Sequence, residues 1–262
     1  MLCCLWKESS RANLEVRNAE LYEYWCPDAQ KNGNFDRIAV LFFLCYDERR
    51  EDTEDLSALL DDDWQTDRQI EICGGTAMII REFEFTLKDG RKALIRSPKE
   101  EDIPGMLDYL YRSAGETDFV LRYPEECGRY TAEGEKELFE RVNSSDSEAM
   151  LVCIVEGKIA GNCQITWNDR IKTRHRASVA IALLKDYWSQ GIGTRLFQEL
   201  IRIAESNKNI LQMELDFIEG NSRARALYEK MGFRITGVGV NAVRLKDGTL
   251  LNEYHMIREI KR

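Results

Sequence analysis

The sequence predicts a mixed α/β domain over residues 78–262, built from a mostly antiparallel sheet flanked by helices. Three observations support this fold class: strand-like segments with alternating apolar residues, amphipathic segments with helical spacing, and short links between them. Three of the links are hairpin turn signals, namely Lys88-Asp89-Gly90, Glu156-Gly157-Lys158 and Lys246-Asp247-Gly248.

The first half of this domain reads as two strands, two helices and a hairpin. Strands are expected at residues 81–87 and 92–96, and Ser97-Pro98 is expected to open a helix that has acidic residues near its start. A second helix is expected at 131–142, and two β-rich segments at 150–155 and 159–167. The irregular segment 118–129 between the helices is expected to lie over a substrate mouth.

The second half alternates strands with helices. Strands are expected at 175–184 and 210–217, with an amphipathic helix between them that begins near Thr194. A helix then spans 221–231 with Gly232 as its C-cap, and a closing hairpin covers 233–243 and 249–256.

Residues 1–77 form a different compositional region, for which we predict no fold. They contain 8 Lys and Arg against 17 Asp and Glu, whereas residues 78–262 contain 29 of each, so the net charge of −9 comes from the first region. Five of the 8 cysteines and only three of the 17 glycines lie there. We therefore divide the chain into an acidic, Cys-rich N-terminal segment, 1–77, and a second domain, 78–262.

The start of translation has two alternatives. In a bacterial gene, codons for Gly74-Gly75 would begin with GG and could form a ribosome-binding site ahead of a start codon at Met78. The other alternative is a translated N-terminal extension. The intact mass of the endogenous protein distinguishes them, because 30.4 kDa excludes the internal start.

Composition excludes several classes. The longest strongly apolar run, 38–46, is far shorter than the roughly 20 residues that a membrane-spanning helix needs, and no secretion signal develops before Lys7. The cysteines form no Cys-x-x-Cys pair and the chain has 2 histidines, so we expect a cytoplasmic protein without a metal site.

A glycine pair at Gly191-x-Gly193 separates the strand at 175–184 from the next helix. Backbone N–H groups at a helix N-terminus suit a phosphate or pyrophosphate, but the pair alone is a weak motif. A dinucleotide-binding loop would need glycine at Leu196, and a nucleoside-triphosphate loop would need Lys after Gly193. Neither nucleotide fingerprint is met.

The segment 181–233 carries a more specific pattern. Strand 181–184, loop 188–194 and the run Leu215-x-Phe217-x-x-x-Asn221-x-x-Ala224-x-x-Leu227-Tyr228-x-x-x-Gly232-Phe233 resemble the GNAT superfamily of acyl-CoA-dependent N-acetyltransferases. The resemblance extends over about 83–258, and it implies splayed central strands. Trp188 departs from the Arg or Gln that the family often has there, so we carry no side-chain role onto it.

The resemblance implies that acetyl-CoA is a cosubstrate and that one set of residues binds it. Backbone groups in the strand would contact the pantetheine arm, the loop amides would hold the pyrophosphate, and an N–H group near Leu183 would stabilise the oxyanion. The implied cofactor-binding residues are Ile181, Leu183, Gln190, Gly191, Ile192, Gly193, Thr194 and Asn221.

Two of the implied residues share one helix. Asn221 is also a good N-cap, which alone would explain it. Tyr228 lies two turns further on nearly the same face, and the resemblance implies that its phenol protonates the departing CoA thiolate.

The base is left open between His175, Glu214, Asp216 and Glu253, and for His175 we favour an exposed strand-end residue. Cys153 and Cys163 lie in predicted strands, where buried thiols are usually inert, which disfavours an acyl-cysteine route.

We predict an N-acetyltransferase in which a primary amine attacks acetyl-CoA directly. The alternative is a non-catalytic acyl-CoA-binding or regulatory module of the same fold. A small-molecule amine and a protein N-terminus both remain open as acceptors. We expect no nucleic-acid or membrane partner, and the sequence does not indicate the oligomeric state.

Overall fold

The computed structural model describes residues 70–73 and 77–262, and the predictions for the rest of 1–77 lie outside these residues. Strands β1 (Ile70–Cys73) and β2 (Ala77–Ile80) pair antiparallel, with Ile70 opposite Ile80. The predicted boundary at 77/78 therefore crosses this hairpin. Among the described residues, no helix is both long and apolar enough to cross a membrane.

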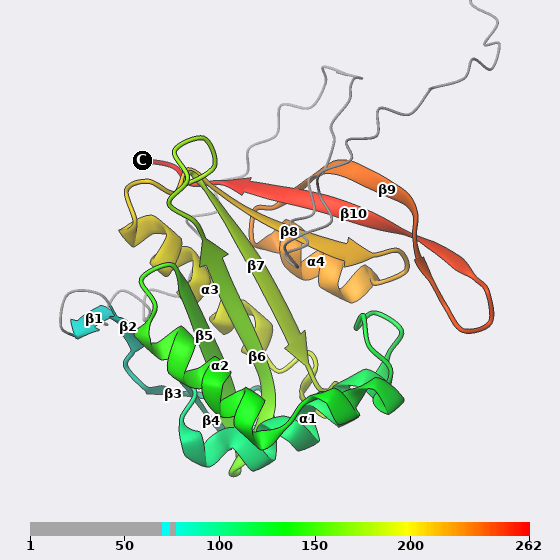
Figure 1. Ribbon diagram of the computed structural model, residues 1–262, viewed down its shortest axis with the longest axis horizontal. Coiled ribbons are helices and arrows are strands. Elements are labelled where there is room, and N and C mark those ends of the chain that lie inside the picture. Colours follow the sequence, from blue (N-terminus) through cyan, green and yellow to red (C-terminus); the bar gives the residue numbers. More distant parts are fainter. Residues whose placement is uncertain (1–69, 74–76) are drawn as a thin grey trace, which may run out of the picture. The chain divides into compact units, whose positions relative to one another are not determined.

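The fold class is confirmed: within the described residues an eight-stranded mixed sheet, of order β3-β4-β5-β6-β7-β8-β10-β9, carries helices on both faces (Figure 1). Every neighbouring pair in this sheet is antiparallel except β7 with β8. The strands are β3 (Phe83–Thr86), β4 (Lys92–Arg96), β5 (Glu148–Val155), β6 (Lys158–Trp167), β7 (Arg176–Leu183), β8 (Gln212–Ile218), β9 (Arg234–Arg244) and β10 (Leu250–Glu259).

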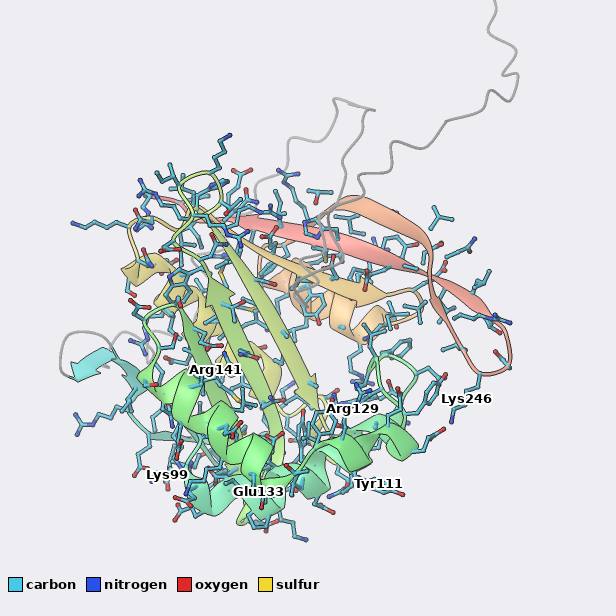
Figure 2. All side chains as sticks on the ribbon, in the orientation of Figure 1. Lys99, Tyr111, Arg129, Glu133, Arg141 and Lys246 are labelled. Carbon is cyan, nitrogen blue, oxygen red and sulfur yellow. The ribbon has the colours of Figure 1, made fainter. Side chains whose placement is uncertain are left out.

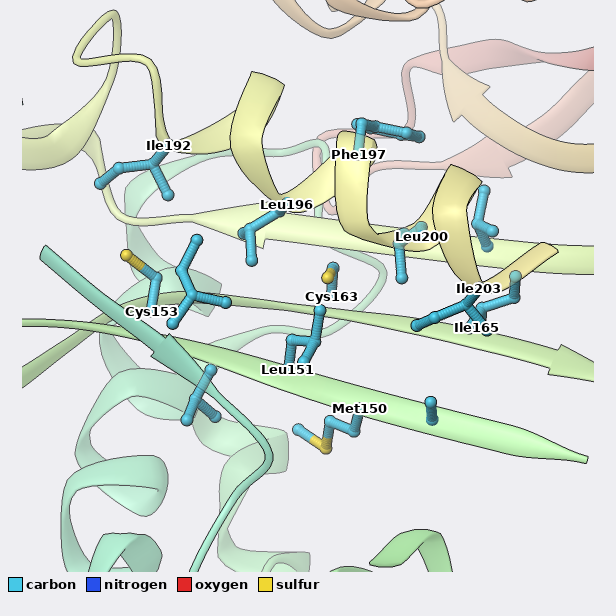
Figure 3. Close-up of a cluster of buried hydrophobic side chains, with 14 of the residues drawn as sticks. Met150, Leu151, Cys153, Cys163, Ile165, Ile192, Leu196, Phe197, Leu200 and Ile203 are labelled. Carbon is cyan, nitrogen blue, oxygen red and sulfur yellow. The ribbon is translucent and has the colours of Figure 1, made fainter. Parts of the chain in front are cut away.

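The helices are amphipathic, as their apolar spacing predicts. They are α1 (Ile103–Glu116), α2 (Ala132–Ser144), α3 (Ile192–Ser206) and α4 (Ser222–Lys230), with 3₁₀ turns η3 (Glu100–Asp102), η4 (Pro124–Arg129) and η5 (Lys185–Tyr187). Figure 3 shows the core between α3 and the sheet, where Leu196 and Leu200 of α3 face Leu151, Cys163 and Ile165 of β5 and β6. These five side chains are at most 1% exposed.

The start of α1 differs from the prediction. Ser97-Pro98 do not open the helix, which begins at Ile103 after the 3₁₀ turn. The reason is Asp102: its carboxylate accepts a hydrogen bond from the N–H of Lys99 (2.7 Å) and pairs with the buried Arg96 (2.6 and 2.9 Å). An ion pair therefore fixes the chain here.

Strands β7 and β8 are paired only at their beginnings. Their parallel register runs from Arg176–Gln212 to Ser178–Glu214, and no further pair joins these two strands within the described structure. Beyond Ser178 the strands diverge (Figure 1). The predicted splay of the central strands is thus present.

Candidate functional site

The splay leaves backbone groups of β7 without a strand partner. The N–H of Leu184 bonds Ala160 of β6 (2.9 Å), and the register between β6 and β7 is regular. Since backbone direction alternates along an antiparallel strand, the N–H and C=O groups of Ile181 and Leu183 point away from β6 toward the gap. The prediction that both residues offer backbone groups to the pantetheine arm needs groups that point into this gap.

A hydroxyl and an indole fix the end of β7. The hydroxyl of the buried Tyr109 of α1 lies within hydrogen-bond distance of two acceptors, the C=O of Ala182 (2.9 Å) and Asn162 Oδ1 (2.8 Å). The indole Nε1–H of Trp188 donates to the C=O of Leu183 (2.9 Å), which leaves the N–H of Leu183 as the group open to a ligand. Trp188, onto which the resemblance carries no side-chain role, therefore ties the loop to the strand.

The N-terminus of α3 presents free backbone donors. Gly191 is the N-cap with φ +94°, a left-handed conformation that favours glycine, and no side chain caps the helix in the described structure. The first intrahelical bond runs from Arg195 N to Gly191 O (3.1 Å), so the N–H groups of residues 192–194 lack helical partners. These donors and the helix dipole favour an anion.

The second glycine serves close packing. A Cβ on Gly193 would lie 2.8 Å from Leu227 Cδ2 of α4. Because such a contact is too short, a side chain here would force the Leu227 side chain to move.

We call the space between this loop and α4 the loop cavity; its volume is about 230 Å³. Seven of the nine predicted site residues line it: Ile181, Leu183, Gly191, Gly193, Thr194, Asn221 and Tyr228. Gln190 and Ile192 do not, because the Gln190 side chain accepts from the N–H of Asp89 (3.2 Å) and Ile192 is 1% exposed in the core. These two residues can offer only backbone groups.

A second cavity of about 140 Å³, the strand cavity, lies between the splayed strands. It is lined by Phe119, Leu121, Val179, Ala180, Ile181, Phe197, Leu215, Asp216, Phe217, Ile218, Asn221, Tyr228 and Glu253. Phe119, Ile181, Asn221 and Tyr228 line both cavities. The two spaces therefore adjoin at these residues, and Tyr228 is reached from both.

Helix α4 carries its two predicted residues as expected. Asn221 accepts from the N–H of Ala224 (3.2 Å), which confirms the N-cap, and its Nδ2 group keeps two donors. Gly232 (φ +82°) ends the helix, with Phe233 N bonded to Tyr228 O (2.9 Å).

Tyr228 sits in an aromatic cluster with Phe197, Phe217 and Phe233. Its side chain is buried, and burial raises the pKa of Tyr228 to about 12. The phenol is thus fully protonated at neutral pH and can donate a hydrogen bond into the cavity.

The carboxylates of β8 lie on the sheet face opposite Phe217. Asp216 Oδ1 is 2.8 Å from His255 Nδ1 of β10, and Glu214 is bonded in a bidentate manner by Arg176 of β7 (2.6 to 3.1 Å). The hydrogen bond to Asp216 is the main cause that raises the pKa of His255. Of the base candidates, Asp216 and Glu253 line the strand cavity and Glu214 is occupied by Arg176.

His175 is not near either cavity. It precedes β7, where its C=O accepts from the N–H of Leu211 (2.8 Å). At a rise of about 3.3 Å per residue, Ile181 is roughly 20 Å away. The favoured interpretation of His175 as a strand-end residue agrees with this position.

The first residues of segment 118–129 border both cavities. Thr117, Phe119 and Val120 line the loop cavity. The turn between β9 and β10 holds this segment, because Lys246 pairs with Glu125, its N–H donates to Tyr123 Oη (3.1 Å) and its Nζ lies 4.1 Å from the Tyr123 ring centroid. Figure 2 shows Lys246 at this turn.

One cation missed by the sequence reasoning lines the loop cavity. Arg223 donates to Ser189 Oγ (2.6 Å), and its guanidinium lies 4.7 Å from the centroid of the Trp188 ring. Its place two residues after the Asn221 cap was the available signal. Among the residues described, no group of three or more His, Cys, Asp and Glu is arranged to hold a metal ion.

Comparisons with known proteins find the same fold in acetyltransferases. Residues 113–233 match the sequence model of the Acetyltransferase (GNAT) family. A solved GNAT-family acetyltransferase from Streptococcus pneumoniae is 29% identical, with a TM-score of 0.60 over 64% of this chain and 99% of that one.

Two further solved structures share the fold. A ribosomal-protein-alanine N-acetyltransferase from Brucella melitensis is 23% identical, with a TM-score of 0.54 over 63% of this chain and 98% of that one. A putative acetyltransferase from Salmonella typhimurium, solved with its cofactor acetyl-CoA, is 16% identical, with a TM-score of 0.55 over 64% and 94%.

Proposed function

Because the chain carries an acetyltransferase domain of the GNAT family, we propose that it moves an acetyl group from acetyl-CoA directly to a primary amine. The observation that carries the proposal is the adjoining pair of cavities: one holds the free amides of α3, the other holds carboxylates, and Tyr228 lines both. Holding both reactants together removes much of the entropy cost of their encounter.

The loop cavity suits acetyl-CoA. The N–H groups of residues 192–194 would hold the pyrophosphate, and the Nδ2 donors of Asn221 and the N–H of Ile181 would bond the pantetheine arm. The N–H of Leu183 points into the same gap and would stabilise the oxyanion on the thioester carbonyl.

The transfer itself needs one proton acceptor and one proton donor. The amine nitrogen forms a bond to the acetyl carbon, the C–S bond breaks, and the CoA sulfur leaves as a thiolate. Tyr228 donates its phenolic proton toward that sulfur. Because burial raises the pKa of Tyr228 to about 12, the phenol is protonated at neutral pH, and the same burial favours the neutral thiol over the departing thiolate.

We assign the proton acceptor to Asp216 together with His255. Asp216 lines the strand cavity, and His255 lies behind it at 2.8 Å, where it can take on the proton that the amine loses. Glu253 also lines this cavity, whereas Glu214 is held by Arg176.

The rate is expected to rise with pH. The pair accepts a proton only when His255 is neutral, and the raised pKa of His255 sets this change above its usual 6.5. We expect kcat/KM to be low at pH 6 and to increase through the slightly alkaline range. Substituting His255→Gln should remove this rise, whereas His175→Gln should preserve it; a pH profile that neither variant changes contradicts the assignment.

Arg223 is expected to strengthen acetyl-CoA binding through its charge. Because its side chain is exposed, the interaction with a phosphate is worth about 1 kcal/mol, so Arg223→Ala should raise the Kd roughly fivefold in low salt and less in high salt. The matched control is Arg225→Ala, on the same helix but bonded to Glu229 (2.8 Å). Equal effects of the two variants, measured by calorimetry, would exclude a phosphate contact of Arg223.

The proposal is tested by titration with acetyl-CoA and by release of free CoA thiol with a mixed panel of primary amines. Saturable binding and amine-dependent thiol release support it. Binding without release for any amine would indicate a non-catalytic acyl-CoA-binding module, and absence of binding would exclude both functions.

A further inference from the structure

The peptide group that joins Ala182 to Leu183 has a buried hydroxyl at one end. Its C=O lies 2.9 Å from the Oη atom of Tyr109, and its N–H is the Leu183 donor proposed above for the oxyanion. In a trans peptide the C=O and the N–H point in opposite directions from one rigid plane. The plane therefore has Tyr109 at its carbonyl end and the gap between the splayed strands at its N–H end.

We propose that Tyr109 is a positioning residue for the transfer: by bonding to the C=O of Ala182, its hydroxyl orients the N–H of Leu183 toward the thioester carbonyl and makes it a stronger donor. This inference rests on the proposed function, because it assigns the residue that supports the oxyanion donor of the same site. Tyr109 acts through this peptide group, since in the described structure it lines neither cavity.

The surroundings of Tyr109 favour this role. Its side chain is 1% exposed, so bulk water does not compete for the bond to Ala182. Burial raises the pKa of Tyr109, which keeps the hydroxyl protonated and able to donate at neutral pH. A hydrogen bond at the oxygen of a peptide group polarises the group, and in a buried site successive hydrogen bonds strengthen one another. The N–H of Leu183 gains from this polarisation.

Close packing holds the same peptide group from another side. Gly161 of β6 faces Leu183 in the strand register, and a Cβ on Gly161 would lie 2.6 Å from the oxygen of Ala182. The next peptide group along β7 is fixed as well, because Trp188 bonds to the C=O of Leu183 (2.9 Å). Both planes that flank Leu183 are therefore held by side chains at the point where β8 has diverged from β7.

The hydroxyl of Tyr109 has a second acceptor. Asn162 Oδ1 lies 2.8 Å from Tyr109 Oη, and Asn162 faces Ala182 in the register of β6 and β7. A phenol has one proton, so Asn162 competes with Ala182 for it. Two variants should therefore act in opposite directions: Tyr109→Phe removes the bond to Ala182, whereas Asn162→Ala leaves the proton to Ala182 alone. A general loosening of β7 would act in the same direction in both.

The test uses the full-length protein and acetyl-CoA labelled with ¹³C at its carbonyl. The readouts are the infrared stretch of the bound carbonyl, calorimetric titration, and CoA thiol release with the fastest amine of a mixed panel. We expect Tyr109→Phe to lower kcat about tenfold, less than the roughly 100- to 1000-fold that loss of an oxyanion donor itself costs. The Kd for acetyl-CoA should stay within about twofold. The carbonyl stretch should move to higher frequency, because the hydrogen bond from Leu183 weakens.

The matched control is Tyr111→Phe on the same helix, whose side chain is 58% exposed (Figure 2). It should change neither kcat nor the carbonyl stretch. Asn162→Ala should keep kcat at or above the wild-type value and move the carbonyl stretch to lower frequency. This second variant decides the question if Tyr109→Phe does not fold.

Three outcomes overturn the inference: an unchanged kcat and carbonyl stretch in Tyr109→Phe, a loss of acetyl-CoA affinity that matches the loss of kcat, or a shift to higher frequency in Asn162→Ala. All three leave the proposed acetyl transfer intact. A wild-type protein that binds no acetyl-CoA, or that releases no CoA thiol with any amine, would overturn the proposed function and this inference with it.

Discussion

The Tyr228→Phe variant should lose about 100-fold in kcat and keep its affinity for acetyl-CoA within a factor of about three. General-acid groups contribute roughly 10²- to 10⁴-fold, and this change removes one hydroxyl without altering the ring that packs against Phe197 and Phe217. The measurement is steady-state CoA release together with calorimetric titration of acetyl-CoA.

The matched control is Tyr254→Phe. Tyr254 stacks on Phe217 at a centroid distance of 5.2 Å, in the same aromatic cluster, but it lines neither cavity. It should keep kcat within about twofold, as expected for an altered hydroxyl outside the reacting groups. Similar losses in both variants, or a loss in acetyl-CoA affinity that matches the loss in kcat, would argue against the acid role.

The second large effect concerns stability. Arg96→Met should lower the free energy of unfolding by about 3–5 kcal/mol, because it leaves the carboxylate of Asp102 buried without its partner. The side chains of Arg96 and Asp102 are 6% and 8% exposed and are joined by two hydrogen bonds of 2.6 and 2.9 Å. Chemical denaturation measures the loss.

Two further variants test the physical reason for this loss. Arg225→Met breaks the exposed pair with Glu229 and should leave the denaturation midpoint unchanged. Combining Arg96→Met with Asp102→Leu should restore much of the stability, because no unpaired charge remains. If the double variant is as unstable as Arg96→Met alone, the loss arises from packing instead.

The Arg96–Asp102 ion pair also affects the geometry of the candidate site, because it fixes the start of α1. This helix positions Tyr109 against the C=O of Ala182, and it ends at Glu116, directly before residues that line the loop cavity. A frayed start of α1 would therefore loosen the end of β7, where the acyl group is proposed to lie.

Local signals predicted most of the fold. The three hairpin turns, the amphipathic helices and the Asn221 cap lie where the sequence places them, because each depends on residues a few positions apart. The predicted start of α1 at Ser97-Pro98 is wrong because the true start depends on an ion pair between side chains and not on local sequence signals. The Arg96–Asp102 pair overrides the helix-start signal of Ser97-Pro98, and helix propensities alone do not predict this pair.

The residues of the candidate site also differ in how far the sequence alone predicts them. The loop amides and Tyr228 come from one short stretch of sequence, and the loop and Tyr228 line one cavity. The pair Asp216–His255 depends on the register between β8 and β10, 39 residues apart in the chain, and no local pattern indicates it. In the sequence, Trp188 is only a departure from the family pattern, because its bond to Leu183 needs the folded loop.

A crystal structure of the full chain with bound CoA tests the central claim most directly. We predict that the pyrophosphate accepts hydrogen bonds from the N–H groups of residues 192–194, and that the CoA sulfur lies within about 3.5 Å of Tyr228 Oη, the distance that proton transfer requires. A pyrophosphate bound elsewhere, or a sulfur atom separated from Tyr228 by protein, would contradict the account.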